Sequence, residues 1–263
     1  MEKDLITPRQ ALIRIARKHQ NAWGTVYADM KNGNYAYDVE DPTPEELRDW
    51  EPITILDDAY PQNLRQHGTR PPFVLFAKGN MANLVPGALM IISPRQYAFE
   101  SKIEAFLQLI VQARIPAIIL WHNPDCNAAN NGFAQEALRA YQNSGVPFAV
   151  ILPDDTKDID AIADGIAASG GLALTEHYPG TPRRLGDPCS RIGASLSKAA
   201  LVLAGNNGSR AGVDAAFALN AGLDVGAIPW LPLTPAGELC NSLIREGAAC
   251  VTCVEDVREL LGE

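Results

Sequence analysis

The 263-residue sequence is short of positive charge and has no long apolar run. It has 22 basic and 31 acidic residues, giving a formal net charge of −9, so a generally basic and adhesive surface is excluded. No apolar run is long enough to span a bilayer, and the charged N-terminal segment lacks the apolar stretch of a secretory signal. We therefore expect a cytoplasmic protein.

The composition is that of a globular protein. The 21 glycines and 19 prolines are near average use, which excludes collagen-like and low-complexity character. The 47% of apolar residues are enough for a buried core.

Cysteine is also scarce, and the five cysteines are odd in number. Only Cys250 and Cys253 have a suggestive spacing, which is typical of a redox pair or of half a zinc site. A zinc site would need further soft ligands, and of the other cysteines only Cys240 is nearby in sequence. The pair lies in an alternating apolar segment, 249–254, which predicts a strand, and residues three apart on a strand point to opposite faces. We therefore predict a buried structural role for the pair, and neither a metal nor a cofactor.

Strand-like and helix-like segments alternate through most of the chain. Strands are predicted at 73–77, 88–92, 117–121, 148–152, 172–174, 200–203, 225–228 and 249–254. Helical patterns are predicted at 100–112, 132–143, 159–168, 192–198, 213–221 and 238–245. This alternation predicts an α/β fold with an extended Rossmann-like, doubly wound and mostly parallel sheet. A closed (β/α)₈ barrel is the alternative, and it is less favoured because the first strand follows a different kind of segment.

That preceding segment, residues 1–58, is predicted to be a small helical N-terminal appendage to a Rossmann-like domain at 59–263. Thr7-Pro8 and Thr43-Pro44 each combine a helix N-cap with proline at the first helical position. The first helix has a cationic side, which is either a solvated face or a contact for nucleic acid; its residues are Arg9, Arg14, Arg17 and Lys18.

Positive charge is concentrated in one part of this acidic chain. Between Arg183 and Arg210 there are five cations and one acid, namely Arg183, Arg184, Arg191, Lys198 and Arg210 against Asp187. A local excess of this kind favours a focused anion site over a solvated cationic face.

Three loops with phosphate-binding chemistry follow predicted strands: 93–95, 175–191 and 205–210. In an open parallel sheet, ligands bind beyond the carboxyl ends of the strands, where helix N-termini and loop amides meet. Arginine supplies a planar fork of donors, and glycine lets backbone amides approach a phosphate closely. Together the loops predict a phosphate-bearing ligand.

Catalytic residues are not evident at this edge. His177 beside Glu176 would form an acid and base pair, but adjacent residues of an extended segment point apart. His122 and Asp125 follow a strand, where a polar turn is the favoured interpretation. Three aromatic residues near the edge would stack on bases or belong to the core, with the core favoured: Tyr97, Phe99 and Trp121. No nucleophile with an attendant base is evident there.

Several segments from about residue 53 onward resemble, in order, motifs of the DprA/Smf family of DNA-processing proteins. The first are Tyr60-Pro61-Gln62-Asn63-Leu64 and 71–80, Pro-Pro-Phe-Val-Leu-Phe-Ala-Lys-Gly-Asn. The next are 175–180, Thr-Glu-His-Tyr-Pro-Gly, and 191–197, Arg-Ile-Gly-Ala-Ser-Leu-Ser. The last are 227–229, Ala-Ile-Pro, and 243–248, with the pattern Leu-Ile-x-x-Gly-Ala.

The resemblance implies an extended Rossmann fold that binds single-stranded DNA, forms a homodimer and assists loading of a RecA-like recombinase. It also implies a binding protein that is not an enzyme. The expected phosphate-binding residues are Ser93, Arg95, Ser190, Arg191, Asn206, Gly208, Ser209 and Arg210. Arg95 and Arg191 would hold phosphates, and the 205–210 loop would contribute amides.

The sequence also departs from the family pattern. Ile92-Ser93-Pro94-Arg95 keeps the arginine of a valine-glycine-serine-arginine motif and replaces its glycine, and Cys189-Ser190-Arg191 replaces arginine-asparagine-arginine. The glycine-rich segment expected at 120–127 is missing, and Ser209-Arg210 begins a loop that is serine-glycine-serine-leucine in the family. The alternatives are a Rossmann-like nucleotide-binding protein, a nucleoside-monophosphate phosphoribohydrolase-like enzyme, and a fold without a ligand.

Overall fold

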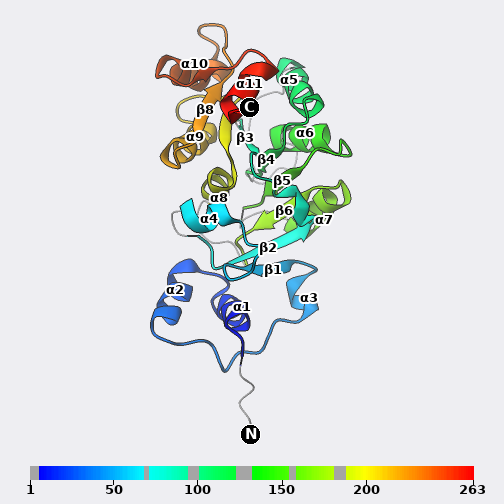
Figure 1. Ribbon diagram of the computed structural model, residues 1–263, viewed down its shortest axis with the longest axis vertical. Helices are drawn as coiled ribbons and strands as arrows, with labels where there is room; N and C mark the ends of the chain where they lie inside the picture. Colours follow the sequence, from blue (N-terminus) through cyan, green and yellow to red (C-terminus); the bar gives the residue numbers. More distant parts are fainter. Residues whose placement is uncertain (1–5, 68–70, 94–100, 123–131, 154–157, 181–187) are drawn as a thin grey trace.

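A nine-stranded mixed sheet forms the centre of the computed structural model, which describes residues 6–67, 71–93, 101–122, 132–153, 158–180 and 188–263 (Figure 1). The strand order is β1-β2-β6-β5-β4-β3-β7-β8-β9. The strands are β1 (Glu51–Thr54), β2 (Val74–Gly79), β3 (Leu89–Ile92), β4 (Ala117–Leu120), β5 (Phe148–Ile151), β6 (Leu172–Thr175), β7 (Ala199–Val202), β8 (Asp224–Ala227) and β9 (Ala249–Cys250).

Strands β3 to β9 pair in parallel, whereas β1 and β2 are antiparallel to their neighbours. From β3 the chain winds outward through β4, β5 and β6, and it then returns to the other side of β3 to form β7, β8 and β9. The predicted doubly wound, mostly parallel sheet is therefore confirmed. The barrel alternative is wrong, because β1 and β9 lie at opposite ends of an open sheet.

Helices cover the sheet on both faces. They are α1 (Pro8–His19), α2 (Trp23–Lys31), α3 (Pro44–Leu47), α4 (Gln62–His67), α5 (Ser101–Gln112), α6 (Gly132–Tyr141), α7 (Ile159–Ala168), α8 (Pro188–Leu196), α9 (Arg210–Asn220), α10 (Glu238–Arg245) and α11 (Val254–Leu261), with single 3₁₀ turns η1 (Met81–Asn83) and η3 (Pro235–Gly237). Figure 1 shows α5, α6 and α7 on one side and α8, α9 and α10 on the other. Because both faces are covered, the central strands are buried at every position. None of the described helices is both long and apolar enough to cross a membrane.

The N-terminal helices lie beside the β1 edge of the sheet, far from β9 (Figure 1). Both predicted caps are present, since the side chains of Thr7 and Thr43 accept hydrogen bonds from the backbone of the first helical turn of α1 and α3. The cationic side of α1 is not a purely solvated face, and its charges are not left available for nucleic acid. Each of its cations contacts an acid: Arg9 with Asp57, Arg14 with Asp41, Arg17 with Glu46 and Lys18 with Asp29.

Residues 51–54 form β1, a strand that the sequence pattern did not indicate. It lies within the predicted appendage and yet pairs with β2 along its whole length. The division at residue 58 stays a prediction.

The predicted strand at 249–254 is wrong beyond Cys250. The carboxylate of Asp256 accepts hydrogen bonds from the backbone amides of Thr252 and Cys253, and this turn starts α11. Cys250 is exposed and Cys253 is half-buried, so the predicted buried role is wrong for Cys250. Among the described residues there is no group of three potential metal ligands.

Candidate functional site

The candidate site lies at the carboxyl edge of the parallel strands, where the winding of the sheet changes direction. Strands β3 and β7 are neighbours, and the chain leaves them toward opposite ends of the sheet. Helices α8 and α9 begin at this edge, because α8 runs back to the start of β7 and α9 runs back to the start of β8. The helix N-termini contribute partial positive charge there.

One buried carboxylate, that of Asp214 on α9, joins three elements at this edge. The Ser190 hydroxyl of α8 donates to Asp214 Oδ1 at 2.6 Å, and His122 Nε2, just after β4, lies 2.7 Å from Asp214 Oδ2. Arg210 at the start of α9 contacts Asp214 Oδ1 through Nε at 3.3 Å and donates through Nη2 to Ser190 Oγ at 2.6 Å. The contacts fix the side chains of Ser190 and Arg210 relative to each other.

The environment of Asp214 keeps its carboxylate ionised. Burial alone would raise the pKa of this group, because a charge is poorly solvated inside the protein. The hydrogen bond from His122, followed by that from Ser190 and the charge of Arg210, outweighs burial and lowers the pKa below its usual value. The site thus contains a permanent negative charge that holds its cations in place.

A second ion pair connects the edge to the N-terminal helices. Arg191, the residue after Ser190 on α8, contacts the carboxylate of Glu176, which follows β6. The backbone oxygen of Glu176 also accepts a hydrogen bond from the Asn21 side chain, between α1 and α2. Asn21 donates to the backbone oxygen of Val74 as well, at 2.8 Å. The appendage and the edge are therefore fixed to each other near Arg191.

The loop between β7 and α9 forms a compact turn. The backbone oxygen of Asn206 accepts from the Ser209 amide at 3.0 Å and from its hydroxyl at 2.7 Å. Gly208 is exposed at the tip of this turn, whereas Ser209 and Arg210 are half-buried. The turn brings backbone amides to the edge directly beside Arg210.

The structure brings only part of the predicted site together. Ser190 and Arg210 are in direct contact, with the Asn206 to Ser209 turn adjoining them and Arg191 paired with Glu176. Ser93 is buried at the end of β3. Several predicted residues lie outside the described residues: Arg95, Tyr97, Phe99, Asp125, Arg183 and Arg184. Trp121 is buried in the core, as the favoured interpretation predicted.

The sequence interpretation missed the acids that organise the site. Asp214 is the only acidic residue of α9 and lies four residues after Arg210, a spacing that brings the two to one helix face. The spacing of Arg210 and Asp214 could have been recognised in the sequence. The pairing of His122 with Asp214 could not, because 92 positions separate them in the sequence. His122 is buried in this pair, so its interpretation as a polar turn is incomplete.

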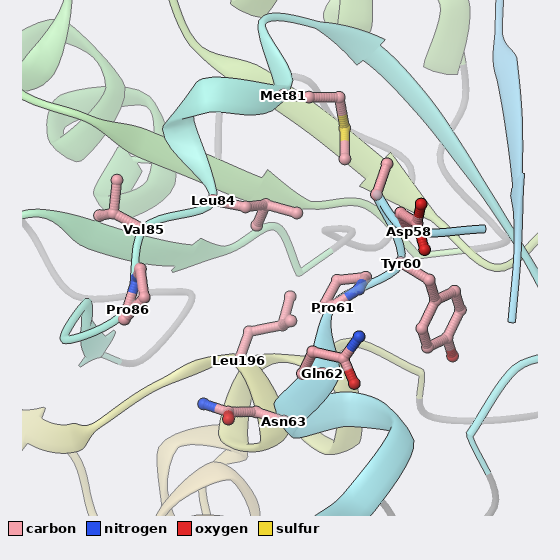
Figure 2. A pocket seen from close by; sticks show the side chains of 11 residues that line it. Asp58, Tyr60, Pro61, Gln62, Asn63, Met81, Leu84, Val85, Pro86 and Leu196 are labelled. Atoms are coloured by element: carbon pink, nitrogen blue, oxygen red, sulfur yellow. The ribbon is translucent and has the colours of Figure 1, made fainter. Parts of the chain in front are cut away.

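A pocket of about 350 Å³ lies elsewhere, at the amino end of β3, and none of the predicted site residues lines it. Figure 2 shows the side chains of Met81, Leu84 and Leu196 around it, together with Tyr60 and Pro61. Tyr60 is buried and donates its hydroxyl proton to the backbone oxygen of Pro72 at 2.7 Å. This part of the tyrosine-proline motif therefore serves the fold.

Comparison with known proteins decides the family. The family model of DNA recombination-mediator protein A matches residues 130–262, just over half of the chain. The chain belongs to this family. The match begins before α6 and includes α8, β7 and α9, which carry most of the candidate site. It does not favour the alternative of a nucleotide-hydrolysing enzyme.

Two bacterial relatives agree with this result. The DNA processing protein DprA of Streptococcus pneumoniae is 27% identical over 217 residues, covering 81% of this chain and 75% of the relative. Its X-ray structure matches with a TM-score of 0.68 at 23% identity, over 98% of this chain and 94% of that chain. DprA of Helicobacter pylori, whose structure is described for its single-stranded DNA binding mode, matches with a TM-score of 0.58 at 14% identity, over 81% and 94%. At these identities the structural matches establish the shared fold.

Proposed function

We propose that this family member binds single-stranded DNA at the carboxyl edge of its sheet and acts as a recombination mediator. The observation that carries the proposal is the contact of Arg210 with Ser190 across the N-termini of α8 and α9. Helix N-termini, loop amides and arginines recognise phosphate without regard to base sequence, as single-strand binding requires. The relative from Helicobacter pylori, described for its single-stranded DNA binding mode, supports the same ligand.

The proposed partners are a RecA-like recombinase and a second copy of this chain, in the cytoplasm. We propose a binding role without catalysis, and the geometry of Ser190 supports it. The Ser190 hydroxyl donates to Asp214, and His122 contacts the other oxygen of that carboxylate. A nucleophilic serine needs a hydrogen-bond partner that is an effective general base, and the carboxylate that accepts from Ser190 is a weak base because its pKa is lowered.

The proposed site is built around the hydrogen-bond network of Asp214. Arg210 and Ser190 form its centre, Arg191 adjoins it on α8, and the turn at 206–209 supplies amides. Arg95 belongs to the proposal on sequence grounds alone. Asp214 and Glu176 orient the two described arginines and limit the positive charge at the edge, which suits an acidic protein that binds DNA locally.

Titration of labelled oligo-dT by fluorescence anisotropy at several salt concentrations tests this proposal. We expect Arg210→Ala and Arg191→Ala each to weaken binding and to reduce the salt slope by about 0.7, because each removes about one phosphate contact on a single strand. Arg139→Ala on α6 is the matched control, since this exposed arginine pairs with Glu136 three residues earlier and lies on a helix outside the proposed site. Absence of binding at micromolar wild-type protein, or equal salt slopes in all variants, would contradict the proposal.

A further inference from the structure

The exposed tyrosines of the described residues all come from one short segment, 27–37, of the N-terminal appendage. Tyr27 on α2 is 47% exposed, and Tyr35 and Tyr37 in the following loop are 39% and 68% exposed. The other described tyrosines are all buried, at 1% for Tyr60, 0% for Tyr141 and 7% for Tyr178. We refer to Tyr27, Tyr35 and Tyr37 as the tyrosine platform.

Tyr27 is the outer ring of an aromatic stack. The ring centroids of Tyr27 and Trp23 are 5.1 Å apart, with 5° between the ring planes. The centroids of Trp23 and Phe73 are 6.1 Å apart, with 13° between the planes. One face of the Tyr27 ring is covered by Trp23, so its exposed area lies on the outer face and the edge. A flat ring supported from behind in this way is pre-organised to stack with a further planar group.

A strained turn displays the other two tyrosines. Ala36, between Tyr35 and Tyr37, has a φ of +51°, which is unfavourable for alanine, and its side chain is buried in a small cluster with Ile15 and Val26. The burial of Ala36 anchors the turn and leaves the two flanking rings outside, 6.1 Å apart in an edge-to-face arrangement. Strain of this kind is retained where the surroundings fix it, and it gathers at functional sites.

The aromatic stack that supports Tyr27 adjoins the carboxyl edge through Phe73. Strand β2 runs antiparallel to β6, with Phe76 opposite Thr175, so Phe73 lies beyond the end of β6 at the edge where α8 begins. Asn21, two residues before Trp23, donates a hydrogen bond to the backbone of Glu176, and Glu176 contacts Arg191.

We propose that the tyrosine platform is a second subsite for single-stranded DNA, which stacks unpaired bases while the carboxyl edge holds phosphates. This inference rests on the proposed function, since it extends the path of the same strand. The platform consists of aromatic side chains without positive charge, so it recognises the bases and contributes little to phosphate binding. Stacking on aromatic side chains is tolerant of sequence because every base has a flat π-face.

The test compares two probes with the same phosphates: oligo-dT and an abasic oligomer of equal length. For Tyr27→Leu and Tyr37→Leu we expect the affinity for oligo-dT to fall about 5- to 10-fold each, in the range of one lost stacking contact. Their affinity for the abasic oligomer and their salt slope on oligo-dT stay as in the wild type. Tyr27→Phe and Tyr37→Phe retain wild-type binding, because phenylalanine keeps the ring.

Leu109→Ala, which removes a half-exposed apolar side chain on α5, is the matched surface control and leaves both affinities unchanged. Thermal unfolding of each variant shows whether it is folded. Tyr37 is the most exposed of the three tyrosines, so Tyr37→Leu is the variant whose stability should change least. If wild-type protein binds oligo-dT and responds to Arg210→Ala while the leucine variants bind normally, the platform inference is overturned and the proposed function stands. If wild-type protein binds no DNA, both fail.

Discussion

At the residue scale, Asp214 determines how the candidate site is built. Its buried carboxylate accepts from Ser190 and contacts His122, which are distant in sequence, and it also contacts Arg210 on its own helix. A buried charge of this kind is costly unless every contact is satisfied. The same property makes Asp214 the residue on which the order of Ser190 and Arg210 depends.

We expect Asp214→Ala to lower the free energy of unfolding by about 3–5 kcal/mol, the usual cost of removing one partner from a buried ion pair. The remaining imidazole and guanidinium would be left in the interior without their carboxylate. Urea unfolding followed by circular dichroism measures the change. Asp41→Ala is the control: its carboxylate is 46% exposed beside Arg14, so we expect a loss of about 0–1 kcal/mol. Equal losses in the two variants would show that Asp214 has no special structural role.

At the scale of the elements, the sequence predicted what local patterns determine. The caps at Thr7 and Thr43 and the helices at 159–168 and 238–245 were predicted at their observed bounds. Helices α8 and α9 begin earlier than predicted, at Pro188 and Arg210, because their first turns carry the polar residues of the site instead of an apolar stripe. Apolar periodicity thus detects the packed part of a helix and misses the polar first turn that carries the candidate site.

The capped helices give a prediction that separates local from tertiary stabilisation. We expect Thr7→Ala to cost about 1 kcal/mol, because the cap satisfies an amide at the start of a 12-residue helix that packs Leu12 and Ala16 into the core. Thr43→Ala should cost less, since α3 has four residues and none of them is buried. Urea midpoints of the two variants measure the difference, and Thr7→Ser should restore most of the stability. A larger loss for Thr43→Ala would contradict this account.

At the scale of the whole molecule, the candidate site depends on contacts that no local pattern contains. The excess of cations between residues 183 and 210 was visible in the sequence, but the acids that meet Arg191 and Arg210 were not included in the predicted site. The fold pairs these arginines with Glu176 and Asp214, so part of the local positive charge is neutralised within the protein. In this way a chain with a net charge of −9 keeps these two arginines oriented at one edge of the sheet.

Carboxylates with a lowered pKa are distributed over the whole molecule. The hydrogen bond from Arg14 lowers the pKa of Asp41, and the backbone of Thr43, followed by Arg17, lowers that of Glu46. For Asp160, burial acts in the opposite direction and is outweighed by hydrogen bonds from Trp50 and Arg48. Two of these groups, Asp41 and Glu46, lie in the N-terminal segment, whereas Asp160 on α7 connects that segment to the sheet domain.

Acid should therefore destabilise this protein by protonating these carboxylates. Because the folded-state pKa values lie below the ordinary values of 3.8 for Asp and 4.5 for Glu, the stabilisation is fully present above those values. It is lost as the pH falls through the lowered folded-state pKa values, when the carboxylates become protonated. We expect the thermal midpoint to fall as the pH drops below the ordinary values of 4.5 and 3.8 and through the lowered folded-state pKa values. High salt should reduce the part of this loss that comes from exposed pairs such as Arg14 with Asp41, and should leave the part from buried Asp214, because screening acts mainly on solvent-exposed charges. A thermal midpoint that stays level as the pH falls through these values would show that these ion pairs do not stabilise the fold.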